Sequence, residues 1–196
     1  MILIVNPAAH GIPLTLPPSF LHVTLTTPYR STIAITSLAR FIAKCKGLVV
    51  PEGDFGSDVQ GIKPIFFDVG KDERKMEEAL KHCRKHMGDN ATILYYGIRA
   101  SFRKLVKEQG KEAGGPWECF YADSFYGWEA DRVVAVTRGA NTMEMITRAK
   151  TLLAVIIVDD GDGDYPMNKE YFQQAADQGL IEVGQLSAET VQLNDS

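Results

Sequence analysis

Two groups of side chains in the sequence could bind a metal ion. Residues 159–164 read Asp-Asp-Gly-Asp-Gly-Asp, and calcium prefers oxygen ligands supplied by loops. Glu170 falls where an EF-hand places its bidentate carboxylate, but a strand rather than a helix is expected before this run. His82 and His86 share one face of an expected helix, where they could hold a metal or lie as solvated cations near its C-terminal end. We expect a solvated acidic loop, a solvated histidine face and no metal site.

The sequence lacks the compact motifs that support catalysis on their own. It has no Gly-x-x-x-x-Gly-Lys-Ser/Thr phosphate loop, no Gly-x-Gly-x-x-Gly turn opening a helix and no Gly-x-Ser-x-Gly elbow. Its cysteines, Cys45, Cys83 and Cys119, are scattered and form no Cys-x-x-Cys pair. We therefore expect reduced thiols, and we do not expect a self-sufficient NTPase.

Three other segments place arginine, glycine and carboxylate side chains where expected strands and helices meet. Residues 26–32, Thr-Thr-Pro-Tyr-Arg-Ser-Thr, end a strand and open a helix. Residues 124–134 form a glycine turn that leads into a strand. Residues 145–150, Met-Ile-Thr-Arg-Ala-Lys, lead into the apolar strand at 152–158.

In this order, the three segments resemble motifs IV, V and VI of the superfamily 1 (UvrD/Rep-type) helicases. Those motifs read roughly Asn-Tyr-Arg-Ser, Lys-Gly-Leu-Glu-x-Asp and Thr-Arg-Ala-Lys/Arg. The resemblance spans about Leu21 to Val158, and the Thr-Arg-Ala-Lys segment before an apolar strand is its most specific part. It implies the second RecA-like domain of an ATP-dependent helicase or translocase. In such motors ATP and Mg²⁺ bind in a cleft between two RecA-like domains, and the first domain supplies the phosphate loop and the magnesium carboxylate.

The resemblance implies roles for five residues. Arg30 and Arg148 would contact the γ-phosphate, because a planar guanidinium is a permanent counter-charge that suits the oxygens of a phosphoryl group. Tyr29 would lie against the adenine ring. Gly127, which has no Cβ, would let the backbone approach the nucleotide, and Glu129 would accept a hydrogen bond from the ribose hydroxyl.

The same residues have simpler explanations that the sequence leaves open. Arg30 could support a helix N-cap at Ser31, Arg148 could be a cation in the last turn of a short helix, and Glu129 could be a surface carboxylate. Three hypotheses follow. The first is a helicase C-terminal domain that is inactive alone because half of the cleft is absent. The second is a degenerate RecA-like module that acts in protein interaction or regulation without hydrolysis. The third is an unrelated α/β enzyme or binding domain.

Several positions depart from the family pattern. Asp123 and Tyr126 stand where family members commonly have histidine and lysine. A carboxylate repels a phosphodiester backbone, so we do not expect this turn to bind single-stranded nucleic acid. Trp128 replaces the motif V leucine and could serve in packing or stacking. A weaker similarity to motif III near the N-terminus would put Asn6 and Ala9 at the places of its aspartate and its γ-phosphate-sensing glutamine.

The elements that must position these residues alternate between strand and helix. Several expected strands are continuous apolar runs, which is typical of parallel strands covered on both faces. The pattern predicts an α/β fold with a three-layer parallel sheet, RecA-like (P-loop NTPase-type) but without its own phosphate loop. The expected strands are 2–5, 21–25, 65–69, 92–96, 118–121, 132–136, 152–158 and 180–183, and the expected helices are 31–44, 71–86, 98–109, 142–150 and 168–178.

Length and charge set the remaining expectations. The 196 residues are interpreted as one domain, 1–196, in which 1–20 would be a remnant of a preceding domain or a linker. A net charge of −4 excludes a generally basic nucleic-acid coat protein. The longest apolar run is far shorter than the ~20 residues of a membrane helix, and no secretory signal is recognised. We expect a cytoplasmic or nuclear protein whose partner is the N-terminal RecA-like domain of a parent chain, with weak nucleic-acid binding and no membrane contact.

Overall fold

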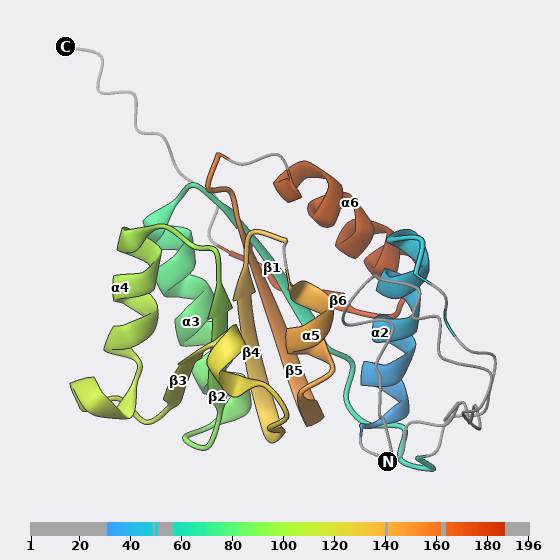
Figure 1. Ribbon diagram of the computed structural model, residues 1–196, viewed down its shortest axis with the longest axis horizontal. Helices are drawn as coiled ribbons and strands as arrows, with labels where there is room; N and C mark the ends of the chain where they lie inside the picture. The colour runs from blue at the N-terminus through green and yellow to red at the C-terminus, as the bar shows by residue number, and fades with distance from the viewer. Residues whose placement is uncertain (1–30, 49, 51–56, 140, 162–163, 187–196) are drawn as a thin grey trace, which may run out of the picture.

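The computed structural model describes residues 31–48, 50, 57–139, 141–161 and 164–186. In this part of the chain, six strands form one parallel sheet in the order β3-β2-β4-β5-β1-β6 (Figure 1). The strands are β1 (Ile65–Gly70), β2 (Thr92–Tyr96), β3 (Glu118–Tyr121), β4 (Ala130–Thr137), β5 (Ala149–Val158) and β6 (Glu182–Val183).

Helices cover both faces of the sheet, as Figure 1 shows. Helices α3 and α4 pack on one face, and α2, α5 and α6 pack on the other. The helices are α2 (Ile33–Cys45), α3 (Glu73–Met87), α4 (Ala100–Glu108), α5 (Thr142–Ile146) and α6 (Asp164–Asp177), and two short 3-10 helices are η1 (Lys111–Ala113) and η2 (Ala122–Phe125). The three-layer α/β architecture expected from the sequence is confirmed.

Side-chain alternation along the central strands explains why both faces are covered. In β4, Val134 and Val136 join the core under α3 and α4, whereas Val133 and Ala135 join the core under the opposite helices. All four side chains are fully buried. A strand that is apolar at every position must be covered on both sides, since either face left in water would expose its valines.

The chain leaves neighbouring strands toward opposite faces. After β1 it enters α3 on one side of the sheet, and after β5 it enters α6 on the other. The ends of these two strands stay joined, because the Asp159 N–H donates to the Gly70 carbonyl at 2.8 Å. This reversal is the place where open α/β sheets commonly form a crevice.

Two helix boundaries differ from the sequence predictions by four residues, and the others by at most two. The helix expected over 142–150 ends at Ile146, because residues from Ala149 onward pair with β4 as part of β5. Helix α6 begins at Asp164, four residues before its expected start at 168, with Pro166 in its first turn, where a missing N–H costs no hydrogen bond.

The expected N-cap at Ser31 is also wrong. Thr32 occupies the cap position without a side-chain cap bond, and the Ser31 hydroxyl donates to the Ala149 carbonyl at 2.6 Å. The first helical N–H groups instead donate to backbone carbonyls of Val59 and Gln60, both at 3.0 Å. The expected strands at 2–5 and 21–25 lie outside the described residues.

Two further findings concern metal sites and membrane-spanning helices. The three cysteines are free thiols, and within the ranges described no group of three or more His, Cys, Asp or Glu side chains could hold a metal ion. No helix in the same ranges combines the length and the apolar character needed to cross a bilayer.

Candidate functional site

The segments that resemble motifs V and VI meet at the amino ends of β4 and β5. The Ala130 N–H donates to the Arg148 carbonyl at 3.0 Å, and Ala130 pairs with Ala149 in the sheet. One step further along, the Thr151 hydroxyl donates to the Asp131 carbonyl at 2.7 Å. Parallel pairing therefore places the two segments side by side.

The start of α2 joins the same edge. The Ser31 hydroxyl binds the Ala149 carbonyl, and the Thr32 N–H donates to the Lys150 carbonyl at 3.0 Å. Ser31 is 91% buried, so its hydroxyl bond is made away from water and fixes the start of α2 firmly against β5. The described end of the motif IV-like segment thus contacts the motif VI-like segment directly.

Arg148 lies between a carboxylate and an aromatic ring. Its Nη2 is 3.3 Å from Oε1 of Glu144, and the two side chains are only 14% and 15% exposed. Its Cζ also lies 5.5 Å from the centre of the Tyr126 ring. The carboxylate and the ring face both favour the cation and hold its side chain in place. A guanidinium has several N–H donors beyond the one that faces Glu144.

Gly127 and Glu129 stand on the turn that leads into β4. Gly127 has a φ of +81°, a conformation that favours glycine, and an added Cβ would meet no atom within 4 Å. The backbone conformation, rather than crowding inside the chain, therefore requires a glycine here. Glu129 Oε2 lies 3.7 Å from Lys150 Nζ, in a pair that is partly exposed to solvent.

A cavity of about 630 Å³ opens beside this turn. It runs under the amino ends of four strands, since the first residues of β2, β3 and β4 and the second residue of β5 all line it. Its wall combines the aromatic side chains of Phe120, Phe125 and Trp128 with the charged side chains of Glu118, Glu129, Asp131 and Lys150.

The structure places three of the five site residues that were proposed from the sequence. Arg148, Gly127 and Glu129 come to one edge of the sheet, although Glu129 lines the cavity and Arg148 does not. Arg30 and Tyr29 lie outside the described residues. The sequence interpretation missed Glu144 as the partner of Arg148. The spacing of four residues was the available signal, because it brings two side chains together on a helix.

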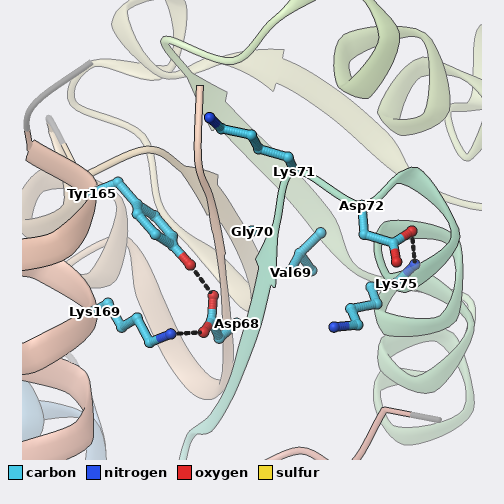
Figure 2. A pocket seen from close by; sticks show the side chains of 8 residues that line it. All are labelled: Asp68, Val69, Gly70, Lys71, Asp72, Lys75, Tyr165 and Lys169. Carbon is cyan, nitrogen blue, oxygen red and sulfur yellow. Dashed lines mark hydrogen bonds and ion pairs between the residues drawn. The ribbon is translucent and has the colours of Figure 1, made fainter. Parts of the chain in front are cut away.

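A second cavity, of about 550 Å³, lies at the opposite edge, near the end of β1 (Figure 2). Its charges are largely paired. Asp68 accepts hydrogen bonds from the Tyr165 hydroxyl at 2.5 Å and from Lys169 Nζ at 2.6 Å, and Lys71 Nζ lies 3.7 Å from Asp159. Burial, followed by the bond to Asp68, raises the pKa of Tyr165, so this hydroxyl remains a proton donor at neutral pH.

The helix start in this second cavity is already capped. Asp72 Oδ1 accepts the N–H of Arg74 at 2.8 Å. It also accepts the N–H of Lys75 at 3.3 Å, which Figure 2 shows. The N–H of Lys75, with that of Arg74, holds the pKa of Asp72 below its usual range. The Asp72 carboxylate thus occupies two of the N–H donors that an open helix start would offer to a phosphate.

Comparisons with known proteins agree with the fold. Searches against protein-family models and against curated proteins found no match. A crystal structure of the C-terminal domain of a possible DNA helicase from Lactobacillus plantarum WCFS1 superposes with a TM-score of 0.54 at 16% identity, over 80% of this chain and 99% of the other. At that identity the likeness establishes the architecture: this chain has a RecA-like α/β fold similar to a helicase C-terminal domain.

Proposed function

We propose that this chain is the second motor domain of an ATP-dependent nucleic-acid helicase or translocase. ATP and Mg²⁺ would be shared with a first RecA-like domain, which would supply the phosphate loop. One observation carries the proposal: the motif V-like and motif VI-like segments meet at one sheet edge through the Ala130–Arg148 hydrogen bond, and Ser31, at the described end of the motif IV-like segment, joins them through its bond to Ala149.

Each site residue has a distinct role in this proposal. Arg148 contacts the γ-phosphate, and Arg30, which precedes Ser31 in the sequence, is its partner in that role. Positive charge is needed there because phosphoryl transfer spreads negative charge over the γ-oxygens. Tyr29 lies against the base, Gly127 lets the nucleotide approach the backbone, and Glu129 accepts a ribose hydroxyl.

Binding that depends on the γ-phosphate tests the proposal. Dissociation constants of MgATP and MgADP are measured by ligand-observed NMR for the wild-type chain and for Arg148→Ala, Arg148→Lys and Arg84→Ala. Arg84 is an exposed arginine of α3 and serves as the matched control. We expect tighter binding of ATP than of ADP, by about 10-fold, because a hydrogen bond to a charged group contributes roughly 1.5 kcal/mol or more.

The variants give clear outcomes. Arg148→Ala removes the preference for ATP, Arg148→Lys keeps part of it because lysine retains charge without the planar fork, and Arg84→Ala keeps all of it. An ATP preference that survives in Arg148→Ala, or that is missing from the wild-type chain, overturns the proposal.

A specific observation favours the degenerate module as a second candidate. Arg148 already has a carboxylate partner in Glu144 and an aromatic partner in Tyr126, and Asp123 stands close to the turn. In a protein-interaction module, Arg148 would make only these contacts within the chain and would bind no nucleotide. Replacing Arg148 by alanine in the organism would then leave the biological output unchanged.

A further inference from the structure

The two tryptophans of the chain lie in opposite environments. Trp117 is fully buried, and its indole N–H donates to the Gly88 carbonyl at 2.7 Å. Trp128 is 70% exposed, although tryptophan is among the residues that proteins bury most completely on average. Of the two roles that the sequence left open for Trp128, internal packing is therefore excluded.

The turn around Trp128 directs it to the edge of the 630 Å³ cavity. Gly127 precedes it with a φ of +81°, and the Trp128 N–H donates to the Phe125 carbonyl at 3.2 Å. Phe125 packs in turn against Phe120, with ring centres 5.2 Å apart, and both rings line the same cavity. The backbone that carries the exposed indole is thus held against a packed pair of phenylalanine rings.

The charges in this cavity match a nucleoside better than a phosphate. Glu118, Glu129 and Asp131 offer hydrogen-bond acceptors. Glu118 is paired with Lys111 at 3.2 Å, and Lys150, the one lysine among the described lining residues, is paired with Glu129. Carboxylates accept from the amino groups of a base and from ribose hydroxyls but repel phosphate oxygens. An indole offers a flat face on which any base can stack.

We propose that this cavity binds the base and ribose of a nucleotide, with Trp128 as the stacking partner of the base. The inference rests on the proposed function in one respect. The phosphate chain of the bound nucleotide would extend out of the acidic cavity toward Arg148. It assigns the stacking role to a residue that replaces the family's leucine, and the base then contacts Trp128 in addition to Tyr29.

Tryptophan fluorescence tests this inference on the chain as it stands. The emission of the wild-type chain is titrated with adenosine, ATP and inorganic tripolyphosphate, and dissociation constants are confirmed by calorimetry. Trp117 is shielded from ligands, so quenching reports on Trp128. We expect adenosine and ATP to quench and tripolyphosphate not to.

Variants locate the binding face. Trp128→Ala should weaken adenosine binding by about 5- to 150-fold, the range expected when one stacking aromatic is lost. Trp128→Phe should recover most of the affinity. Tyr121→Ala removes an exposed aromatic ring outside the cavity and should leave the affinity unchanged. Because Trp128 is exposed, circular dichroism of the variants should match that of the wild type.

The outcomes separate this inference from the proposed function. If adenosine does not bind at millimolar concentration, or binds equally well to Trp128→Ala, the inference is overturned even when Arg148 still confers a preference for ATP over ADP. If that preference is absent while adenosine binding still depends on Trp128, the motor role fails and the nucleoside site stands. Quenching by single-stranded oligonucleotides alone would assign Trp128 to strand binding and would also overturn the inference.

Discussion

Arg148 combines permanent charge with low exposure, so its neighbours decide how strongly it is held. Its pair with Glu144 lies between the exposed ion pairs that contribute little to stability and the buried pairs whose disruption is costly. Tyr126 adds an aromatic ring 5.5 Å from the guanidinium carbon. The same contacts that stabilise the resting chain would compete with a γ-phosphate for the guanidinium.

Removing the carboxylate should therefore affect both stability and binding. We expect Glu144→Gln to lower the free energy of unfolding by about 1 kcal/mol, because a mostly buried charge loses its partner. The same variant should bind MgATP more tightly, since a competing anion is gone. Urea unfolding and the ATP titration measure the two effects, with the exposed Glu77→Gln as control. Weaker ATP binding in Glu144→Gln would contradict the competition.

The contact between Gly61 and Thr32 gives a second prediction at this scale. An added Cβ at Gly61 would lie 2.4 Å from the Thr32 Cβ, and its φ of +75° already disfavours any other residue. Gly61→Ala should destabilise the chain by about 2 kcal/mol or more. Gly114→Ala, at a φ of +79° with no atom within 4 Å of an added Cβ, should cost only about 1 kcal/mol. Equal losses in the two variants would show that the contact is not tight.

At the scale of elements, apolar continuity was a sufficient signal for the strands. β2 and β3 match their expected bounds, and the first of these runs is followed directly by Gly97. The groups that cap the N-terminus of α2 could not be predicted from residue types. The groups that satisfy its first N–H donors are backbone carbonyls at Val59 and Gln60, which are far away in the sequence and have no residue-type signature.

Helix α3 shows the opposite case, in which a local side chain forms the cap. Asp72 accepts two backbone N–H groups, and its pKa is lowered, so its stabilising effect is complete above the pKa of an unfolded aspartate and is lost as pH falls through the folded value. We expect Asp72→Ala to cost about 1 kcal/mol at pH 7. The difference from wild type should shrink near pH 3, measured by urea unfolding. The exposed Asp89→Ala should be near neutral at both pH values, and a constant Asp72 effect would contradict the role of its carboxylate.

At the scale of the whole molecule, the sequence predicted the three layers of the fold but not the cavities. A cavity depends on how side chains from four strands pack at one edge, and Thr92, Glu118, Ala130 and Lys150 are far apart in the chain. Trp128 stood out by residue type alone, and only its exposure in the structure excludes internal packing. The role of Arg30 stays a prediction because that residue lies outside the described part of the chain.

The isolated chain should not hydrolyse ATP above the buffer rate. Its sequence has no phosphate loop, and the helix start nearest to that place in the fold is closed by Asp72. A phosphate-release assay with Mg²⁺ measures the rate, with buffer and Arg148→Ala as controls. Magnesium-dependent turnover that disappears in Arg148→Ala would show that this chain carries a complete active site.

The length of β5 also affects how small-molecule ligands could be used to study the chain. Arg148 directly precedes this ten-residue strand and Asp159 directly follows it, so about 30 Å of extended backbone separates the two ends. Two small molecules, one in each cavity, could occupy the chain together without touching. Compounds selected against one end would leave the other end open for a fluorescent tracer, and any influence between them would have to pass through the rigid body of the sheet.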